Sequence, residues 1–295
     1  MAAGGSRGIY ISLDSGTSWT TNTAPTFLTG VASSANGTTL VAMHQNYAAY
    51  SHDQIWYSTN AATTWAQAGM PDSIWNSVAS SADGSKLVAV GTWIFTSSNS
   101  GATWVSNNVP KEQWQAVAAS ADASRLAAAA YHSGILISTN SGTNWTWTSA
   151  PTTNWWAIAS SADGSRLTAA VYGGGIYIST NWGMNWNKTD APNANWQAVA
   201  CSADGSRLAA VAYGGGIYSA SSIPAPVLSI ARPGHDFLIS WVIPSRNFVI
   251  QQTLDLTVLN WGTLTNAPGF NYTNLENEVT VAPSNSRGFY RLVAP

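Results

Sequence analysis

Charged side chains are scarce in this sequence. Lys, Arg, Asp and Glu make up 8% of the 295 residues, whereas about 25% is usual in a soluble domain. The net charge is −2, and Lys and Arg form no cluster. Nucleic acids and anionic membrane surfaces are bound through clustered cations, so we expect neither as a partner.

Cysteine and long apolar runs are also nearly absent. The one cysteine, Cys201, excludes a disulfide within the chain and a metal site built from several thiolates. No apolar run reaches the length of a membrane-spanning helix, so we expect no membrane insertion. Residues 1–5 do not resemble a signal peptide, yet the Ser, Thr, Asn and Gly content is typical of exported proteins. We therefore expect a secreted or cell-surface protein whose leader is absent from this sequence.

Helical periodicity is missing as well, because Gly, Ser, Thr and Asn interrupt every apolar run. A unit of about forty residues recurs instead, which indicates a propeller or a solenoid. Its clearest copy spans 152–192 and begins TTNWWAIASSADGSRLTAAVYGGGIYIS. The register of the copies is marked by one tryptophan in each, at Trp19, Trp65, Trp104, Trp145 and Trp186.

Each unit predicts four short strands. In 152–192, the runs WWAIAS and SRLTAAVY are joined by an Asp163-Gly164 turn, GIYIS follows, and a fourth strand begins at Trp186. Four strands in about forty residues make a propeller blade, whereas a solenoid repeat of this length contains helices. The predicted fold class is therefore all-β, with a β-propeller as its main part.

The strand count predicts five blades, with six as the alternative. The last copy, which starts near Trp196, has no fourth strand, and the chain opens with a third and a fourth strand around Trp19. The simplest closure lets the Trp19 strand complete the Trp196 blade, because this removes an open sheet edge. One third strand is then left over, which leaves room for a sixth blade or for a chain trimmed at its N-terminus.

The repeat ends at a short Pro-rich segment. We predict a propeller over 1–222, a linker over 223–226 and a second domain over 227–295, which reads as a small β-sandwich of alternating strands. This last region resembles the C-terminal immunoglobulin-like modules of secreted bacterial proteins. The resemblance rests on ISW, IQQT-DL with a following Trp, and FYRL, at 239–241, 250–256 with Trp261, and 289–292. It implies export and no activity.

A second resemblance lies in the turns of the repeat. Residues 12–19, SLDSGTSW, are similar to the Asp-box, or BNR repeat, S-x-D-x-G-x-x-W, of sialidases and xyloglucanases. In later copies Asn replaces the Asp, at Asn60, Asn99, Asn140 and Asn181. In those families the box is a structural turn away from the active face. The Ser-Ala-Asp-Gly-Ser turns resemble those of WD40-like repeats. Both resemblances imply a fold and no function.

One end of the predicted blades gathers aromatic and amide side chains, because the second-to-third and fourth-to-first loops meet there. Gly-rich stretches at 173–175 and 214–216 lie at the same end. The candidate ligand-binding residues are Trp75, Trp114, Trp155, Trp196, Tyr131, Tyr172, Tyr213, Gln113, Asn154 and Asn195. Aromatic faces beside amides suit a neutral saccharide. In the competing interpretation, first strands line the propeller centre and these tryptophans are core side chains.

Three functions are compatible with these patterns. The favoured one is a non-catalytic, lectin-like protein that binds a neutral saccharide or a cell-surface glycan without a cofactor. The first alternative is a self-associating or scaffold protein of the cell surface, because the surface is poorly charged and a surplus strand could complete a neighbouring protomer. The second alternative is a glycan-active hydrolase related to the Asp-box enzymes.

The hydrolase lacks evident catalytic groups. A glycosidase needs two convergent carboxylates, and most of the 13 carboxylates fall in turns or beyond residue 226. Those that remain are Asp53, Asp72, Glu112 and Asp190, and nothing in the sequence pairs them. A sialidase also needs three arginines, but Arg125, Arg166 and Arg207 each follow the same turn, as Lys86 does, on the side away from the aromatic end. We therefore predict no catalytic residues.

One loop departs from the repeat. The segment 44–53 is longer than its counterparts and contains two histidines and an aspartate. Imidazole and carboxylate groups are metal ligands, so the candidates are His44, His52, Asp53 and, from an equivalent loop, His132. Their spacing matches no metal motif. We predict a plain loop insertion and no metal.

Overall fold

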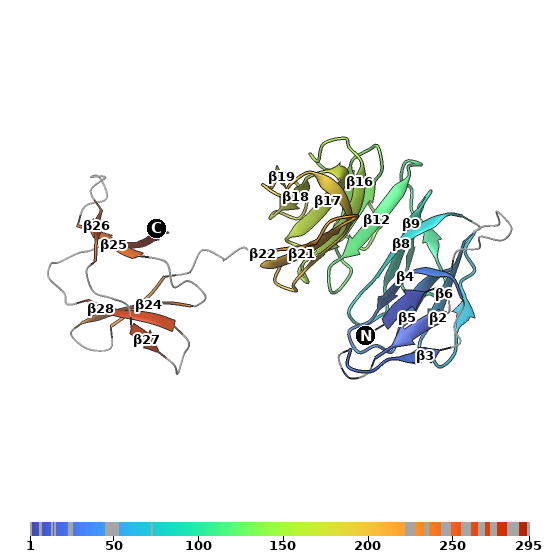
Figure 1. Cartoon of the computed structure of the whole chain (residues 1–295), viewed down its shortest axis with the longest axis horizontal. Coiled ribbons are helices and arrows are strands. Elements are labelled where there is room, and N and C mark those ends of the chain that lie inside the picture. Colours follow the sequence, from blue (N-terminus) through green and yellow to red (C-terminus); the bar gives the residue numbers. More distant parts are fainter. Residues whose placement is uncertain are drawn as a thin grey trace. The chain divides into compact units, whose positions relative to one another are not determined.

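The computed structural model describes residues 2–5, 8–12, 14, 16–22, 26–44, 53–71, 73–221, 228–232, 236–242, 249–254, 261–264, 269–271, 276–281 and 289–293. Every regular element among them is a β-strand (Figure 1). None of the described residues belongs to a helix that could cross a membrane. The chain divides into two compact units, Met1–Ser221 and Ser222–Pro295, at the Pro-rich segment.

The first unit consists of successive antiparallel sheets that each hold about one repeat. Three of them contain four strands in chain order. Their strands are β4 (Leu28–Ser33), β5 (Leu40–His44), β6 (Gln54–Ser58) and β7 (Ala66–Gln67); β8 (Trp75–Ser80), β9 (Leu87–Gly91), β10 (Ile94–Ser97) and β11 (Val105–Ser106); and β12 (Trp114–Ala119), β13 (Leu126–Ala130), β14 (Ile135–Ser138) and β15 (Thr146–Trp147).

The last two repeats share one continuous sheet. Its strands are β16 (Trp155–Ser160), β17 (Leu167–Gly174), β18 (Ile176–Ser179), β19 (Asn187–Lys188), β20 (Ala194–Cys201), β21 (Arg207–Ala212) and β22 (Ile217–Ser221). The two repeats are joined because β17 extends past the core and pairs with β20, where Tyr172 lies opposite Asn195. The Gly-rich stretch 173–175, predicted as a loop, is therefore in part a strand.

The predicted closure by the Trp19 strand is wrong. The strand that follows Trp19, β3 (Thr20–Asn22), pairs with β2 (Gly8–Ile11), and β2 also pairs with β1 (Ala2–Gly5), which the sequence did not predict. In this way β3 keeps a partner close in sequence, whereas joining the Trp196 sheet would close a far longer loop. With β16–β19 and β20–β22 counted separately, the described residues of the first unit form six sheets. The first and the last have three strands each, so the predicted count of five gives way to the alternative of six.

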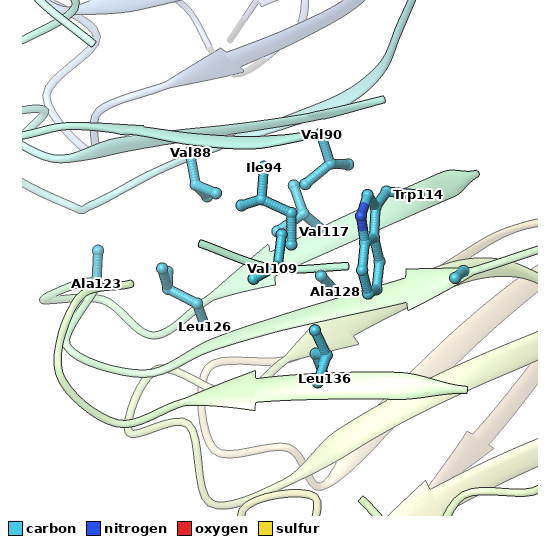
Figure 2. Packing of buried hydrophobic residues seen from close by; sticks show 11 residues of the cluster. Val88, Val90, Ile94, Val109, Trp114, Val117, Ala123, Leu126, Ala128 and Leu136 are labelled. Carbon is cyan, nitrogen blue, oxygen red and sulfur yellow. The ribbon is translucent and has the colours of Figure 1, made fainter. Parts of the chain in front are cut away.

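The core lies in layers between successive sheets. The inner strands β4, β8, β12, β16 and β20 contact one another in that order. Figure 2 shows one layer, in which Val88, Val90 and Ile94 pack against Trp114 and Leu126 of the next sheet. The same positions of each repeat fill the next layer, so one pattern of side chains is used repeatedly.

Backbone hydrogen bonds also tie the turns of neighbouring sheets together. In the turn between the first and second strands, the Ala82 N–H donates to the Ala121 carbonyl at 2.6 Å, and the Ala121 N–H donates to Ala162 at 2.7 Å. Ala35 and Ala162 extend this row to five sheets by the same contact. The turn end of the first unit is therefore a continuous hydrogen-bonded edge.

The second unit is a small β-sandwich. One sheet contains, in spatial order, β23 (Ser229–Ala231), β24 (Phe237–Val242), β28 (Glu276–Val281) and β27 (Gly269–Asn271); the other contains β26 (Gly262–Thr263), β25 (Val249–Thr253) and β29 (Phe289–Val293). Buried Ile239 and Val279 from the first sheet pack with Ile250 and Tyr290 from the second. Two sheets that share an apolar layer form a sandwich.

Candidate functional site

The four tryptophans predicted to bind a ligand are core side chains. Trp75 is 3% exposed, and Trp114, Trp155 and Trp196 are 0% exposed. A fully buried indole presents no face to a saccharide, so this part of the predicted site is wrong. The competing interpretation, in which first-strand tryptophans fill the space between sheets, is the correct one.

A repeated β-bulge explains why these tryptophans point inward. Directly after Trp155 the register between β16 and β17 shifts by one residue, and the same shift follows Trp75, Trp114 and Trp196. A bulge adds one residue to a strand and re-aims the side chains beside it. Simple alternation along the strand therefore predicts the wrong face of the sheet for the extra residue at each bulge.

In one sheet the bulged residue is Trp156, and it is a functional candidate that the sequence analysis missed. Its ring lies 5.1 Å from that of Tyr172 and 6.1 Å from that of Tyr131, measured between centroids. Tyr172 is exposed, and the other two rings are half-buried. We call Tyr131, Trp156 and Tyr172 the aromatic strip. The double tryptophan was the available signal, because other copies carry Asn76, Gln115 or Gln197 at this position.

The predicted amide residues lie beside the predicted tyrosines. The N–H of Tyr131 donates to the Gln113 carbonyl at 2.9 Å, and the N–H of Tyr172 donates to the Asn154 carbonyl at 2.8 Å. Tyr213 and Asn195 repeat this contact at 2.8 Å. The structure therefore brings each predicted tyrosine together with an amide residue, in three successive sheets.

An open cleft adjoins this end of the sheets. It has a volume of about 430 Å³ and is lined by Ile74, Asn76, Gly91, Thr92, Lys111, Glu112 and Gln113. Of the ten predicted ligand-binding residues, only Gln113 lines it. The cleft contains one cation, one carboxylate and two amides, which suits a polar ligand of low charge.

The metal candidates that the structure describes have structural contacts. A ring nitrogen of His44 is hydrogen-bonded to the Thr26 carbonyl, and the Asp53 carboxylate accepts the Trp75 N–H at 3.3 Å. The His132 ring lies edge-on to Tyr131 at 4.1 Å. His52 lies outside the described residues. Within the described ranges, no three His, Cys, Asp or Glu side chains are grouped as metal ligands.

Most described carboxylates of the repeats serve their own turns. In the turn after β16, Ser161 Oγ donates to Asp163 Oδ1 at 2.6 Å and the Ser165 N–H donates to it at 3.0 Å. These hydrogen bonds to serines lower the pKa of Asp163 from 3.8 to about 2. The pKa of Asp14, Asp83 and Asp122 is lowered to about 2 in the same way, and that of Asp204 is also lowered.

The basic residues of these turns reach the neighbouring sheet. Lys86 Nζ donates to the Asp122 carbonyl at 3.2 Å, and the Arg125 guanidinium lies over the Trp182 ring at 4.8 Å. The Arg125 side chain also covers Gly164, whose positive φ of 73° and close contact leave no room for a Cβ. These cations therefore link sheets at the turn end, away from the aromatic strip. Of the four carboxylates considered for catalysis, Asp72 lies outside the described residues.

The last sheet exposes an isoleucine whose equivalents in the preceding repeats are buried. Ile217 of β22 is 81% exposed, whereas the equivalent Ile94 and Ile135 are 0% exposed. Ala198, Ala200, Ala209 and Val211 lie on the same side and are exposed or half-buried. We call these five residues the end face. At the other end of the unit, Trp19 is 44% exposed.

Comparison with known proteins identifies the architecture. No family model and no curated protein matches the chain. A solved structure, "YCF48 bound to D1 peptide", matches with a TM-score of 0.54 at 13% identity, over 80% of this chain and 83% of that one. YCF48 from Cyanidioschyzon merolae matches with a TM-score of 0.52 at 13% identity, over 71% and 75%. The chain has a β-propeller fold. At this identity the likeness shows the fold alone.

Proposed function

We propose that the protein is a non-catalytic scaffold that assembles through the end face. The observation that carries the proposal is Ile217, which is 81% exposed at a position that is buried in the preceding repeats. Large exposed apolar side chains that adjoin one another mark interaction surfaces in soluble proteins. The end face has the same kinds of side chain that hold the sheets of this unit together.

The matching surface is the outer side of the first sheet. In the later repeats, the tryptophan before the fourth strand packs against the preceding sheet, as Trp145 and Trp186 do. Trp19 occupies this position in the first repeat and is 44% exposed. The end face and the outer side of the first sheet, which carries Trp19, therefore match the two surfaces that pack together between successive sheets inside the unit. We infer that the end face of one copy packs on the first sheet of another.

This contact joins two different surfaces, so it is heterologous. Heterologous contacts form a closed ring if the rotation between copies closes, and an extended polymer if it does not. Either product presents many equal aromatic strips and cleft surfaces in a regular array. Such an array fits a scaffold role, and the proposal includes the export that the composition predicts.

Replacing Ile217 by Lys should abolish this assembly, because a charged side chain would have to be desolvated at the centre of the contact. Sedimentation velocity of the full chain should show mass above 31.0 kDa that rises with protein concentration. The matched control is Val105→Lys, which places the same charge at a 65% exposed position of β11, outside the end face. A monomer at all concentrations, or equal behaviour of both variants, would rule out the proposal.

Saccharide binding remains a second candidate, and the aromatic strip is the observation that favours it. Aromatic rings offer the flat apolar surface that packs on sugar C–H groups, and Gln113 and Asn195 provide exposed amides in the adjoining sheets. Repetition of such sites raises the avidity for a multivalent glycan without new contacts. The buried tryptophans have no part in this version of the site.

Replacing Tyr172 by Ala should reduce the affinity for a neutral oligosaccharide, as measured by titration calorimetry against a panel of glycans. Trp182→Ala is the control, because Trp182 is a comparably exposed tryptophan at the turn end of the same sheet. No heat from any glycan of the panel with the unaltered protein would exclude this candidate. Equal losses in both variants would place the site elsewhere.

A further inference from the structure

A cavity of about 300 Å³ lies between the sheets β16–β19 and β20–β22. Ligand pockets in proteins begin at about this size. Five apolar side chains and one threonine form most of its wall: Ile176, Ala191, Leu208, Ala210, Tyr218 and Thr168. The carboxylate residue Asp190 and Pro192 also line it.

Each of these walls has an equivalent one repeat earlier, and there the space is filled. In the layer between β12–β15 and β16–β19, the equivalents are Ala127, Ile135, Ala150, Leu167, Ala169 and Tyr177. These six residues pack together with Trp186, the tryptophan that precedes the fourth strand. The last repeat has no such residue, because no tryptophan follows Ser221 until Trp241 in the second unit. The cavity therefore corresponds to the site of a tryptophan that the last repeat does not supply.

The strand edge beside the cavity is also unpaired. In the complete repeats, the third strand pairs with a two-residue fourth strand, as Ile178 does with Asn187 and Thr96 with Val105. The last third strand, β22, pairs only with β21 among the described strands. A strand edge with free backbone groups accepts an added antiparallel strand.

We propose that this edge and cavity form a binding site for an extended peptide segment of a partner protein that begins with tryptophan. The peptide backbone pairs with β22 as a fourth strand, and the indole enters the cavity between Leu208, Ala210 and Tyr218. Backbone pairing alone gives little sequence preference, whereas the cavity selects the side chain at one position.

The chain's own repeats indicate what should precede that tryptophan. The indole N–H of Trp104 donates to the Gly101 carbonyl at 3.0 Å, and that of Trp145 donates to Gly142 at 3.0 Å. An indole N–H without a partner in an apolar cavity loses a hydrogen bond, as that of Trp186 does, so a ligand that carries its own turn, like those before Trp104 and Trp145, is favoured. The expected ligand class is therefore Asn-x-Gly-x-x-Trp followed by a short extended stretch.

The test uses a fluorescently labelled peptide that copies residues 97–106, SSNSGATWVS, and anisotropy titration with the full chain. A buried tryptophan in a pocket is a typical hot spot, so the peptide with Trp104→Ala should bind about thirtyfold more weakly or worse. Ala210→Leu fills the cavity and should cause a similar loss. Ala200→Leu adds the same bulk on the end face and should leave the peptide affinity unchanged.

Ala210 is buried, so a failure of Ala210→Leu to fold would also abolish binding. A second variant at an accessible position avoids this ambiguity. Tyr218 is 40% exposed, and Tyr218→Ala removes one wall of the cavity at an accessible position, so it should also weaken binding. Equal affinity for the Trp and Ala peptides, or no binding at millimolar protein, would overturn the proposal. A second copy that occupied the site through Trp19 would compete with the peptide. Peptide binding would then fall as the protein concentration rises and would be restored by Trp19→Ala, and this result would overturn the proposal in favour of a second copy as occupant. Ile217→Lys should abolish assembly and retain peptide binding, which separates this site from the scaffold proposal.

Discussion

Replacing Trp155 by Ala should lower the melting temperature of the first unit by roughly 6–20 °C. Truncating a buried Trp to Ala costs about 3–5 kcal/mol, and each kcal/mol shifts the melting temperature by about 2–4 °C in a unit of this size. Trp155 is 0% exposed, packs edge-on to Tyr177 at 5.2 Å, and donates its indole N–H to the Pro151 carbonyl at 3.1 Å. Its loss removes contacts to both neighbouring strands and leaves a cavity between two sheets.

The neighbouring tryptophan provides the matched control. Trp156 lies at the bulge and is half-buried, and its described ring contacts are with Tyr131 and Tyr172. Aromatic pairs contribute about 0.5–1.5 kcal/mol beyond burial, so Trp156→Ala should lower the melting temperature by only a few degrees. Differential scanning calorimetry of both variants decides the matter. A larger decrease for Trp156→Ala than for Trp155→Ala would contradict the assignment of Trp155 to the core.

The propeller fold was predictable because the sequence repeats its strand pattern. The spacing of Trp104, Trp145 and Trp186, with a Gly-containing turn before each, fixes where third and fourth strands meet. The structure places the turn there in every case, with Ser138 donating to Asn140 at 3.0 Å as one example. A repeated local pattern that agrees with the global fold is strong evidence for that fold.

The facing of the first strands was not predictable from alternation. A strand alternates between two faces with a period of two, but the bulge after each first-strand tryptophan inserts one residue. Both faces of an inner strand are also covered by neighbouring sheets, so polarity gives no second signal. The loop arrangement places the tryptophans at the aromatic end of the blades, and alternation cannot show that their rings point inward or that Trp156 is the aromatic residue at the bulge.

The ends of the propeller were the other feature that the sequence could not settle. Strand counting treats β3 as free to join any blade that lacks a fourth strand. In the structure β3 stays with β2, and the short run Ala2–Gly5 adds to the same sheet although its composition is poor for a strand. Gly and Ala have low strand propensity, so the pairing comes from the tertiary context. The scaffold proposal rests on the end face, and the peptide-site proposal rests on the edge of β22, which pairs only with β21 among the described strands.

The turn edge also predicts an effect on stability at acidic pH. The hydrogen bonds that lower the pKa of Asp83, Asp122 and Asp163 to about 2 exist only in the folded protein. A carboxyl whose pKa is lower when folded stabilises the fold above its unfolded pKa, and this stabilisation disappears as pH falls through the folded pKa. The ordinary value for Asp is 3.8, so the loss should lie between about pH 4 and pH 2. Because the row of backbone hydrogen bonds joins these turns, losing them together should weaken several sheet contacts at once.

The melting temperature should therefore stay level from about pH 7 to pH 5 and fall steeply below about pH 4. Replacing Asp83, Asp122, Asp163 and Asp204 by Asn should remove most of that fall and preserve the fold at neutral pH. The chain contains the precedent: Asn36 holds the corresponding turn of the β4–β5 pair, where its Oδ1 accepts from Ser34 Oγ at 2.7 Å and from the Thr38 N–H at 3.1 Å. Asn keeps this acceptor and cannot be protonated in this range.

The control variant, Glu112→Gln with Asp190→Asn, removes two carboxylates outside the turns and should retain the steep fall. An unchanged acid transition in the fourfold turn variant, followed by circular dichroism, would show that other groups govern acid unfolding.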